Sequence, residues 1–294
     1  MNWTVEFKRE ENPSVARVII AGYWDGDVKA VHGLLADVCQ QWPTGYKVRY
    51  LITCGGFVEF DWPLAPVMGR TMPPVSDRLD RLISAAQKYC HSLLDNELRE
   101  KLRKYTRYLT LGVDSAEEPD NLRKPHVELV TLLDLEKGKW HWTGKSYPVT
   151  NQEAGLERVT ELETHLLDLE GEKVMILGCH DLNMFSRRSQ AIAKGWRREV
   201  IQEIYSLACS MKPTRVLQHP HTTDSVKTWQ TALSGLLKSV LTVRDFASAG
   251  KWYREDEYGL QAKPRSPLGE VLKKTKLGKT IDIVVWTRCS TDKG

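Results

Sequence analysis

The first half of the chain alternates apolar runs with amphipathic stretches, which predicts strands that alternate with helices. Residues 15–21 (VARVIIA) form a short β-branched run bounded by Pro13 and Gly22, as is typical of a buried strand. Asp27 then caps a helix in which apolar residues recur at three- and four-residue steps as far as Trp42. Beyond it we expect a strand at 47–54, a helical stretch from 76 towards 105, a strand at 108–112, a loop at 117–124 and a β-hairpin of 126–135 with 139–143.

The second half repeats this outline. We expect a strand at 173–178, a helix at 190–210, a strand at 214–218, a helix at 225–240, and strands near 242–247, 258–262 and 281–286. Two β-α-β-α stretches, each followed by further strands, indicate an α/β protein with two sheets that carry helices on their outer faces. Because no low-complexity linker divides the halves, residues 1–294 are interpreted as a single domain.

Composition and charge narrow the choice of protein class. With 294 residues and 41% apolar content, the chain can bury the core of one large α/β domain. The net charge is only +4, and no run of five or six basic residues offers a stripe for phosphates, so nucleic acid is not the expected partner. The first twenty residues carry charges where a signal peptide would need an apolar stretch, and no long apolar segment follows. We therefore expect a cytoplasmic protein that does not associate with a membrane.

Six cysteines are scattered along the chain without a CxxC pair, which favours reduced thiols over a disulfide framework or a zinc ribbon. Cys179 differs from the others because it directly follows the apolar strand KVMILG, at the edge where open α/β sheets present their functional loops. If a helix begins close behind it, the amino end of that helix would favour a thiolate and could supply N–H groups for an oxyanion hole. Cys179 is therefore the candidate nucleophile.

Charged residues at the ends of other strands could join it. Lys145 stands at the exit of the expected hairpin, and Glu153 follows it by eight positions. Glu59 lies just beyond the second strand, with Asp61 as an alternative carboxylate. Taken singly, each of these is more often a solvated loop residue, so the combination carries the interpretation.

In order and spacing these residues resemble the nitrilase superfamily of carbon-nitrogen hydrolases. That family has a Glu after an early strand, a Lys after a hairpin with a second Glu eight positions on, and a Cys-Tyr-Asp motif at a strand end. Here the corresponding residues are Glu59, Lys145 with Glu153, and Cys179-His180-Asp181, which begins 34 positions after the lysine. Two departures are that Val58 replaces the usual Pro before the catalytic Glu and His180 replaces the usual Tyr or Trp. A third is the pair Arg187-Arg188, near where many members carry a carboxylate. Together with His180 it suggests a differently shaped or more basic pocket.

The resemblance implies an α-β-β-α sandwich and a cysteine-dependent amidase or nitrilase reaction through a thioester. Cys179 would attack the carbon of an amide, carbamoyl or nitrile group, Glu59 would carry the proton, and Lys145 would stabilise the negative oxygen. The backbone N–H of His180 would be a second donor to that oxygen, and Glu153 would pair with Lys145 or position the substrate amine. No metal or organic cofactor is required. The expected partners are a small-molecule amide or nitrile and, as relatives commonly pair, a second copy of the chain in a homodimer or larger homo-oligomer.

Two alternatives from other classes remain open. His219 and His221 with Asp224 follow one strand and could bind a metal ion in a metal-dependent hydrolase. A non-catalytic binding protein on the same sandwich would instead use the ten tryptophans and the Arg187-Arg188 pair as an interaction surface. Thiol reactivity separates them, because only the cysteine hydrolase requires a thiolate at Cys179.

Overall fold

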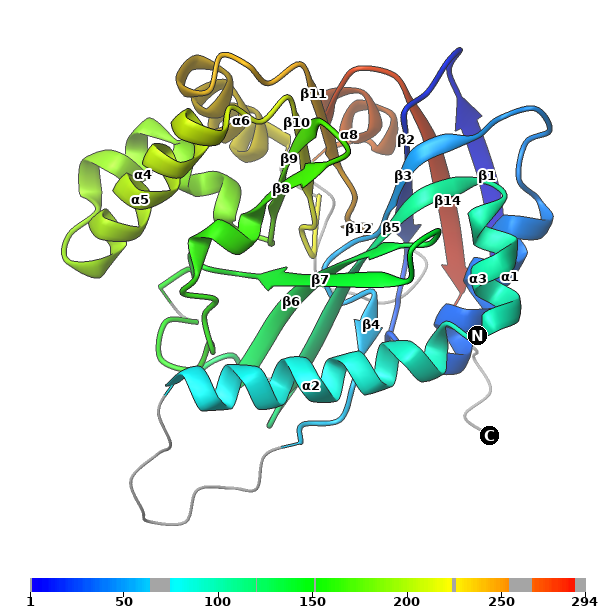
Figure 1. The fold of residues 1–294 in the computed structure, drawn as a ribbon, viewed down its shortest axis with the longest axis horizontal. Helices are drawn as coiled ribbons and strands as arrows, with labels where there is room; N and C mark the ends of the chain where they lie inside the picture. The colour runs from blue at the N-terminus through cyan, green and yellow to red at the C-terminus, as the bar shows by residue number, and fades with distance from the viewer. Residues whose placement is uncertain are drawn as a thin grey trace.

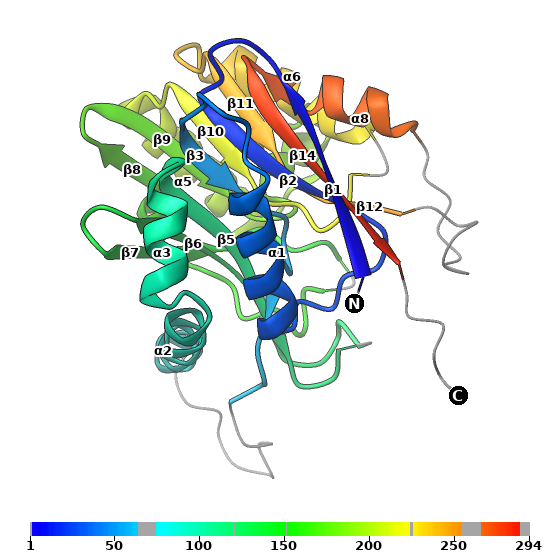
Figure 2. The same ribbon diagram turned by 90° about the vertical axis from the view of Figure 1, so that its right-hand side faces the viewer.

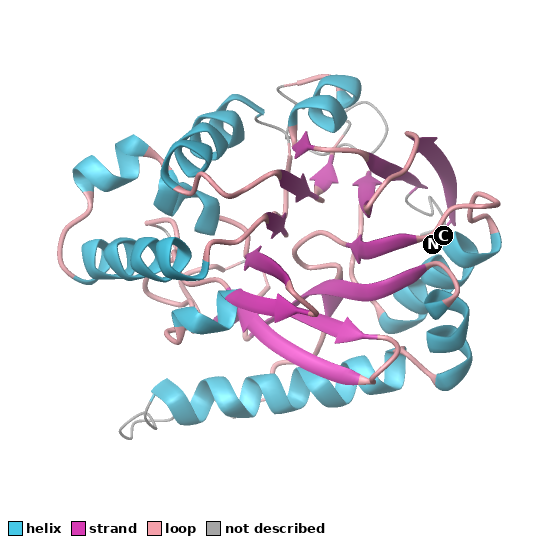
Figure 3. Cartoon of the chain, turned by 45° about the horizontal axis from the view of Figure 1, so that its top comes forward, coloured by secondary structure: helices cyan, strands magenta, loops and turns pink. Residues whose placement is uncertain are grey.

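Two β-sheets stacked face to face form the centre of the protein, and helices cover the outer face of each sheet (Figures 1 and 3). The structure is a computed structural model that describes residues 2–63, 75–119, 121–150, 152–223, 226–253 and 266–288. The α-β-β-α sandwich implied by the sequence is confirmed.

The first sheet is the larger of the two and mixes parallel with antiparallel pairs. Its main path runs β1-β14-β2-β3-β5-β6-β7, while β12 pairs with β2 and β4 with β5. The pairs between β14, β2, β3 and β5 are parallel, so the carboxyl ends of these strands lie at one edge. The strands are β1 (Asn2–Arg9), β2 (Val15–Ala21), β3 (Val48–Ile52), β4 (Val58–Glu59), β5 (Thr106–Ala116), β6 (His126–Asp134), β7 (Lys139–Gly144), β12 (Lys251–Trp252) and β14 (Thr280–Arg288).

The second sheet has the order β13-β11-β10-β9-β8. Its strands are β8 (Leu166–Leu169), β9 (Glu172–Leu177), β10 (Arg215–Gln218), β11 (Asp245–Ser248) and β13 (Lys276–Leu277). The strands β9, β10 and β11 are parallel neighbours. Segments that follow β9 and β10 therefore leave the sheet side by side.

The helices lie in two groups. One group packs on the first sheet: α1 (Val28–Gln40), α2 (Val75–Leu93) and α3 (Asn96–Arg103). The other includes α5 (Trp196–Met211) and α6 (Val226–Ser239), which pack on the second sheet, and the short α4 (Arg187–Ile192). The helix α8 (Leu268–Lys274) closes one end of the core between the sheets. Two 3-10 helices, η1 (Leu162–His165) and η2 (Asp181–Phe185), precede β8 and follow β9.

Successive side chains of the buried strands point to opposite faces of each sheet and pack into three separate layers of the hydrophobic core. In β2, Val15 and Ile19 face the second sheet, whereas Val18 and Ile20 face the helices. In β9 the faces are again divided, with Ile176 between the sheets and Leu177 beneath α5 and α6. Because both faces of these strands are covered, they carry continuous apolar runs, which made them recognisable in the sequence.

Most of the expected elements are confirmed, and the exceptions have local causes. The single helix expected at 190–210 is wrong: α4 and α5 are separated by residues 193–195, where Gly195 takes a positive φ of 54° that ends regular helix. Neither β1 nor α8 was expected. β1 alternates charged residues with partly buried Trp3, Val5 and Phe7, and it pairs with β14 from the other end of the chain (Figure 2). The strand expected at 258–262 lies outside the described residues.

Candidate active site

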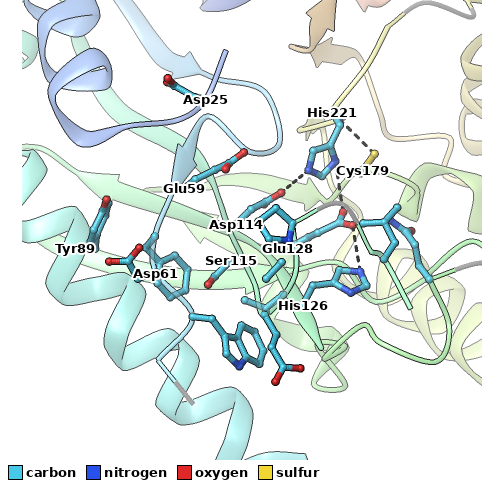
Figure 4. A pocket seen from close by; sticks show the side chains of 18 of the residues that line it. Asp25, Glu59, Asp61, Tyr89, Asp114, Ser115, His126, Glu128, Cys179 and His221 are labelled. Atoms are coloured by element: carbon cyan, nitrogen blue, oxygen red, sulfur yellow. Dashed lines mark hydrogen bonds and ion pairs between the residues drawn. The ribbon is translucent and has the colours of Figure 1, made fainter. Parts of the chain in front are cut away.

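A pocket of about 780 Å³ opens where the two sheets meet, and residues from both sheets line it (Figure 4). The first sheet contributes Glu59 from β4, Asp114 from β5 and Glu128 from β6. The second sheet contributes Cys179, just after β9, and His221, just after β10. The volume is in the range of small-molecule sites.

Cys179 is buried at the base of this pocket, with 5% of its surface exposed. Its Sγ accepts a hydrogen bond from the backbone N–H of His221 at 3.3 Å. One ring nitrogen of His221 and one carboxylate oxygen of Glu128 also lie within 4.8 Å of Sγ and of each other. Burial alone would raise the pKa of the thiol, but the charges and hydrogen bonds of His180 and His221 lower it to about 5. The thiolate is therefore the stable form at neutral pH, as a nucleophile requires.

Lys145 lies at the exit of β7 with its ammonium fully buried. The Nζ atom donates to both carboxylate oxygens of Glu128, each at 2.8 Å, and to Oε1 of Gln152 at 2.5 Å. Burial would lower the pKa of Lys145, but the Glu128 carboxylate and the Cys179 sulfur raise it. Burial would raise the pKa of Glu128, but His221 and Lys145 hold it at about 2. Both partners of this pair are therefore charged, next to the sulfur.

Asp181 fixes the position of Lys145 relative to Cys179. Its fully buried carboxylate accepts hydrogen bonds from the backbone N–H groups of Ser146 and Tyr147 on one oxygen, and of Gly178 on the other, at 2.8–3.0 Å. A Cβ on Gly178 would lie 2.9 Å from Oδ2 of Asp181 and 3.1 Å from the Lys145 backbone, so a larger residue there would displace one of them. Asp181, the acidic residue of the Cys-His-Asp motif, thus joins the segment after β7 to the segment after β9 by hydrogen bonds.

His221, which the sequence suggested only as a metal ligand, and Asp114, which it did not suggest, complete the inner wall of the site. Nε2 of His221 lies 2.5 Å from Oδ2 of Asp114, and Nδ1 lies 3.5 Å from Oε2 of Glu128. Asp114 and Glu128 are direct cross-strand partners in the β5·β6 pair. The only sequence signal for them was an acidic residue inside each of two apolar strands, where charges are rare.

The structure brings Lys145 and Cys179 together as expected, but it places Glu59 elsewhere on the pocket wall. In Figure 4 the Glu59 carboxylate lies on the far side of Asp114 and His221 from Cys179. Within the described part of the chain no hydrogen bond or ion pair joins it to the sulfur or the ammonium; the carboxylate in that place is Glu128. Desolvation at the wall, and the charge of Asp114, raise the pKa of Glu59 to about 6. Asp61 is exposed at the same wall.

The two residues expected to bind substrate, Glu153 and His180, lie in different places. Glu153 does not reach Lys145; it accepts hydrogen bonds from Trp196 and Arg197 of α5, on the outside of the pocket. His180 lines the pocket, with its ring 5.8 Å from that of Trp229. Among the described residues none accepts a hydrogen bond from the backbone N–H of His180, which leaves it free for a ligand beside the sulfur.

The residues of the metal alternative do not converge. His219 is turned towards the carbonyl of Thr53, at 2.7 Å from Nδ1, whereas His221 faces Asp114 and Glu128. Asp224 lies outside the described residues. Within the described chain, Glu128, Cys179 and His221 form the one set of three close metal-binding side chains, but the Lys145 ammonium already contacts both carboxylate oxygens. A metal ion there would have to displace that ammonium.

The pocket is acidic rather than basic. Among the described residues that line it there is no lysine or arginine, whereas seven carboxylates do so: Asp25, Asp27, Glu59, Asp61, Asp114, Glu117 and Glu128. The expectation of a more basic pocket from Arg187-Arg188 is therefore wrong, because both residues are exposed at the start of α4 and neither lines the pocket.

Sequence and structure comparisons give different amounts of information. No protein-family model matches the chain, and no curated protein matches it by sequence. Among solved structures, a variant of an amidase of the nitrilase superfamily from Nesterenkonia AN1 is similar over 95% of this chain and 92% of its own, with a TM-score of 0.51 and 13% identity. A second variant of that amidase, solved after Michael addition of acrylamide at its active-site cysteine, has a TM-score of 0.49 and 12% identity over 93% of each chain. The chain therefore has the fold of the nitrilase superfamily.

Proposed function

We propose that this protein is a cysteine-dependent hydrolase that cleaves a C–N bond of an amide, carbamoyl or nitrile group. The single observation that carries the proposal is the buried Cys179 thiol, with its pKa lowered to about 5, beside the charged Lys145–Glu128 pair at the base of a pocket. Structural cysteines in apolar surroundings show the opposite shift. Cys90 illustrates this, because burial raises its pKa to about 12.

The geometry supports a defined role for each group. With an amide or carbamoyl substrate, the Cys179 thiolate attacks the carbon. The negative oxygen that develops is stabilised by the N–H of His180 and by the positive charge of Lys145, whose three N–H groups are bonded to Glu128 and Gln152. Glu128 and Gln152 hold the ammonium in place. Collapse of this intermediate releases ammonia or an amine and leaves a thioester, which water then hydrolyses to the acid.

A proton must also reach the leaving nitrogen and later be taken from water. The resemblance implies Glu59 for this step, and a carboxyl with a pKa of about 6 suits proton transfer near neutral pH. Its position on the wall, beyond His221 and Asp114, leaves it without direct contact to Cys179 among the described residues. Cytoplasmic location, from the composition of the chain, and a homo-oligomeric state, from the family resemblance, belong to the same proposal.

The test is to incubate wild-type protein and Cys179→Ala with a panel of small amides and nitriles, and to look by mass spectrometry for a trapped acyl group. Cys209→Ala is a matched control, because Cys209 is exposed on α5 and does not line the pocket. Wild type and the control should turn over at least one substrate, and Cys179→Ala none. Full activity of Cys179→Ala would contradict the proposal, and loss of activity to chelators would favour the metal alternative. A protein with neither activity nor selective alkylation at Cys179 would be a binding protein.

A further inference from the structure

We propose that His221, held by Asp114, is the proton carrier for Cys179, a role that the family resemblance gives to Glu59. The inference deepens the proposed function and rests on it. It assigns a third catalytic residue and a positioning residue, and neither belongs to the Glu-Lys-Cys pattern that the sequence suggested.

The ring of His221 lies between two carboxylates and the sulfur (Figure 4). Nε2 is 2.5 Å from Oδ2 of Asp114, and Nδ1 is 3.5 Å from Oε2 of Glu128. One ring nitrogen lies within 4.8 Å of the Cys179 Sγ. Catalytic hydrogen bonds are often long in an enzyme without substrate and shorten when substrate binds. The backbone N–H of His221 already donates to Sγ. These contacts place the His221 ring, which can carry a proton, beside the Cys179 sulfur. The Asp114 carboxylate is the acceptor on the other side of the ring.

The backbone around His221 is built to hold this ring. Gly55 and Gly56 pack against it, since a Cβ on Gly55 would lie 3.0 Å from Nδ1 and one on Gly56 would lie 3.4 Å from Cδ2. Gly56 has a positive φ of 58°, which a larger residue would adopt only with strain. The carbonyl of His221 accepts a hydrogen bond from the Lys251 backbone at 2.8 Å. The Gly55-Gly56 pair after β3 thus makes room for the histidine.

The charges around the ring favour a thiolate–imidazolium pair. The titratable groups near His221 or Cys179 come from eight segments of the described chain: Cys54 after β3, Glu59 of β4, Asp114 of β5, Glu128 of β6, Lys145 after β7, Cys179 and His180 after β9, His221 after β10 and Lys251 of β12. Burial would lower the pKa of His221, but Asp114, Glu128 and Cys179 raise it well above its usual value. The ring is therefore protonated while the sulfur is not.

The proton balance of the reaction follows. With an amide or carbamoyl substrate, once the sulfur–carbon bond has formed, the imidazolium gives its proton to the departing nitrogen, the C–N bond breaks, and ammonia or an amine leaves. The neutral ring then takes a proton from water, and the resulting hydroxide attacks the thioester. Collapse of the second intermediate breaks the C–S bond and restores the thiolate and the imidazolium. Asp114 keeps the ring in orientation throughout.

The experiment measures alkylation of Cys179 by iodoacetamide against pH, by mass spectrometry of its peptide, in wild type, His221→Gln, Asp114→Asn and Glu59→Gln. In wild type the rate should fall with an acid limb near pH 5. His221→Gln should move this limb to higher pH while the lowering of the Cys179 pKa by His180 remains, and Asp114→Asn should move it in the same direction but less far. Glu59→Gln should shift it far less. Exposed Cys209 is the internal control in every sample and should keep one profile.

Hydrolysis rates give the second readout. His221→Gln should lower kcat by roughly 10²- to 10⁴-fold, more than Glu59→Gln does. If His221→Gln keeps both the acid limb and kcat while Glu59→Gln loses kcat, the inference is overturned and the proposed function stands. If Cys179→Ala keeps full hydrolysis, the proposed function fails, and the alkylation profile still reports on His221. Should His221→Gln not fold, as judged by circular dichroism, Asp114→Asn decides, since an unmoved limb in that variant contradicts the inference.

Discussion

Replacing Glu128 by glutamine removes one charge from the buried pair at the base of the pocket and leaves the other without compensation. The Lys145 ammonium has no exposed surface, and two of its three hydrogen bonds end on the Glu128 carboxylate. Breaking a buried ion pair by removing one partner typically costs about 3–5 kcal/mol, because the remaining charge stays desolvated. We therefore expect the free energy of unfolding of Glu128→Gln, from urea titration at pH 7, to fall by about that amount.

A comparison with a more exposed ion pair shows how much of the loss in unfolding free energy comes from burial of the charge. Glu153 also forms an ion pair, with Arg197 at 3.1 Å, but its side chain is 39% exposed, so Glu153→Gln should cost below about 1 kcal/mol. The double variant Glu128→Gln, Lys145→Met should be more stable than Glu128→Gln alone, because no unpaired charge remains. The reasoning is refuted if Glu128→Gln unfolds at the wild-type urea concentration, or if the double variant is less stable than the single one.

The pH dependence of stability checks the same pair. The pKa of Glu128 is lowered to about 2 in the folded protein, so its contribution is present above the unfolded value of about 4.3 and is lost as the pH falls through 2. Wild type should therefore lose more stability than Glu128→Gln between about pH 4.3 and pH 2.

Three further outcomes are expected. Asp181→Asn should lower the free energy of unfolding by about 1–3 kcal/mol. The reason is that its new NH₂ group would face a backbone N–H group that now donates a hydrogen bond to the Asp181 carboxylate. The control Asp168→Asn, whose exposed side chain accepts one hydrogen bond from Gly171, should change the free energy of unfolding little. The kcat/KM of wild type should show an acid limb near pH 5, where the Cys179 thiolate is protonated; a limb near pH 8 would show that the thiol is not activated. Amides with a distant ammonium group should have higher kcat/KM than those with a distant carboxylate, because seven carboxylates line the pocket. This preference should weaken with added salt, and equal values at low ionic strength would contradict it.

What the sequence determined was set by local pattern. The strand at 15–21, the helix capped by Asp27 and the hairpin at 126–143 follow from periodicity and turn chemistry within a few residues, and the structure confirms each. Cys179 was distinguished by its place directly after an apolar strand, and Lys145 by its place after the hairpin. Both placements also depend only on neighbouring residues.

What only the tertiary structure decided is which charged groups surround the sulfur. Glu128 and Asp114 meet because β5 and β6 pair in one particular register, and His221 joins them because β10 lies beside β9 in the other sheet. Spacing along the chain selected Glu59 and Glu153 instead. A separation in sequence carries no information about which face of a strand reaches a pocket between two sheets, since that depends on how the sheets are stacked and registered.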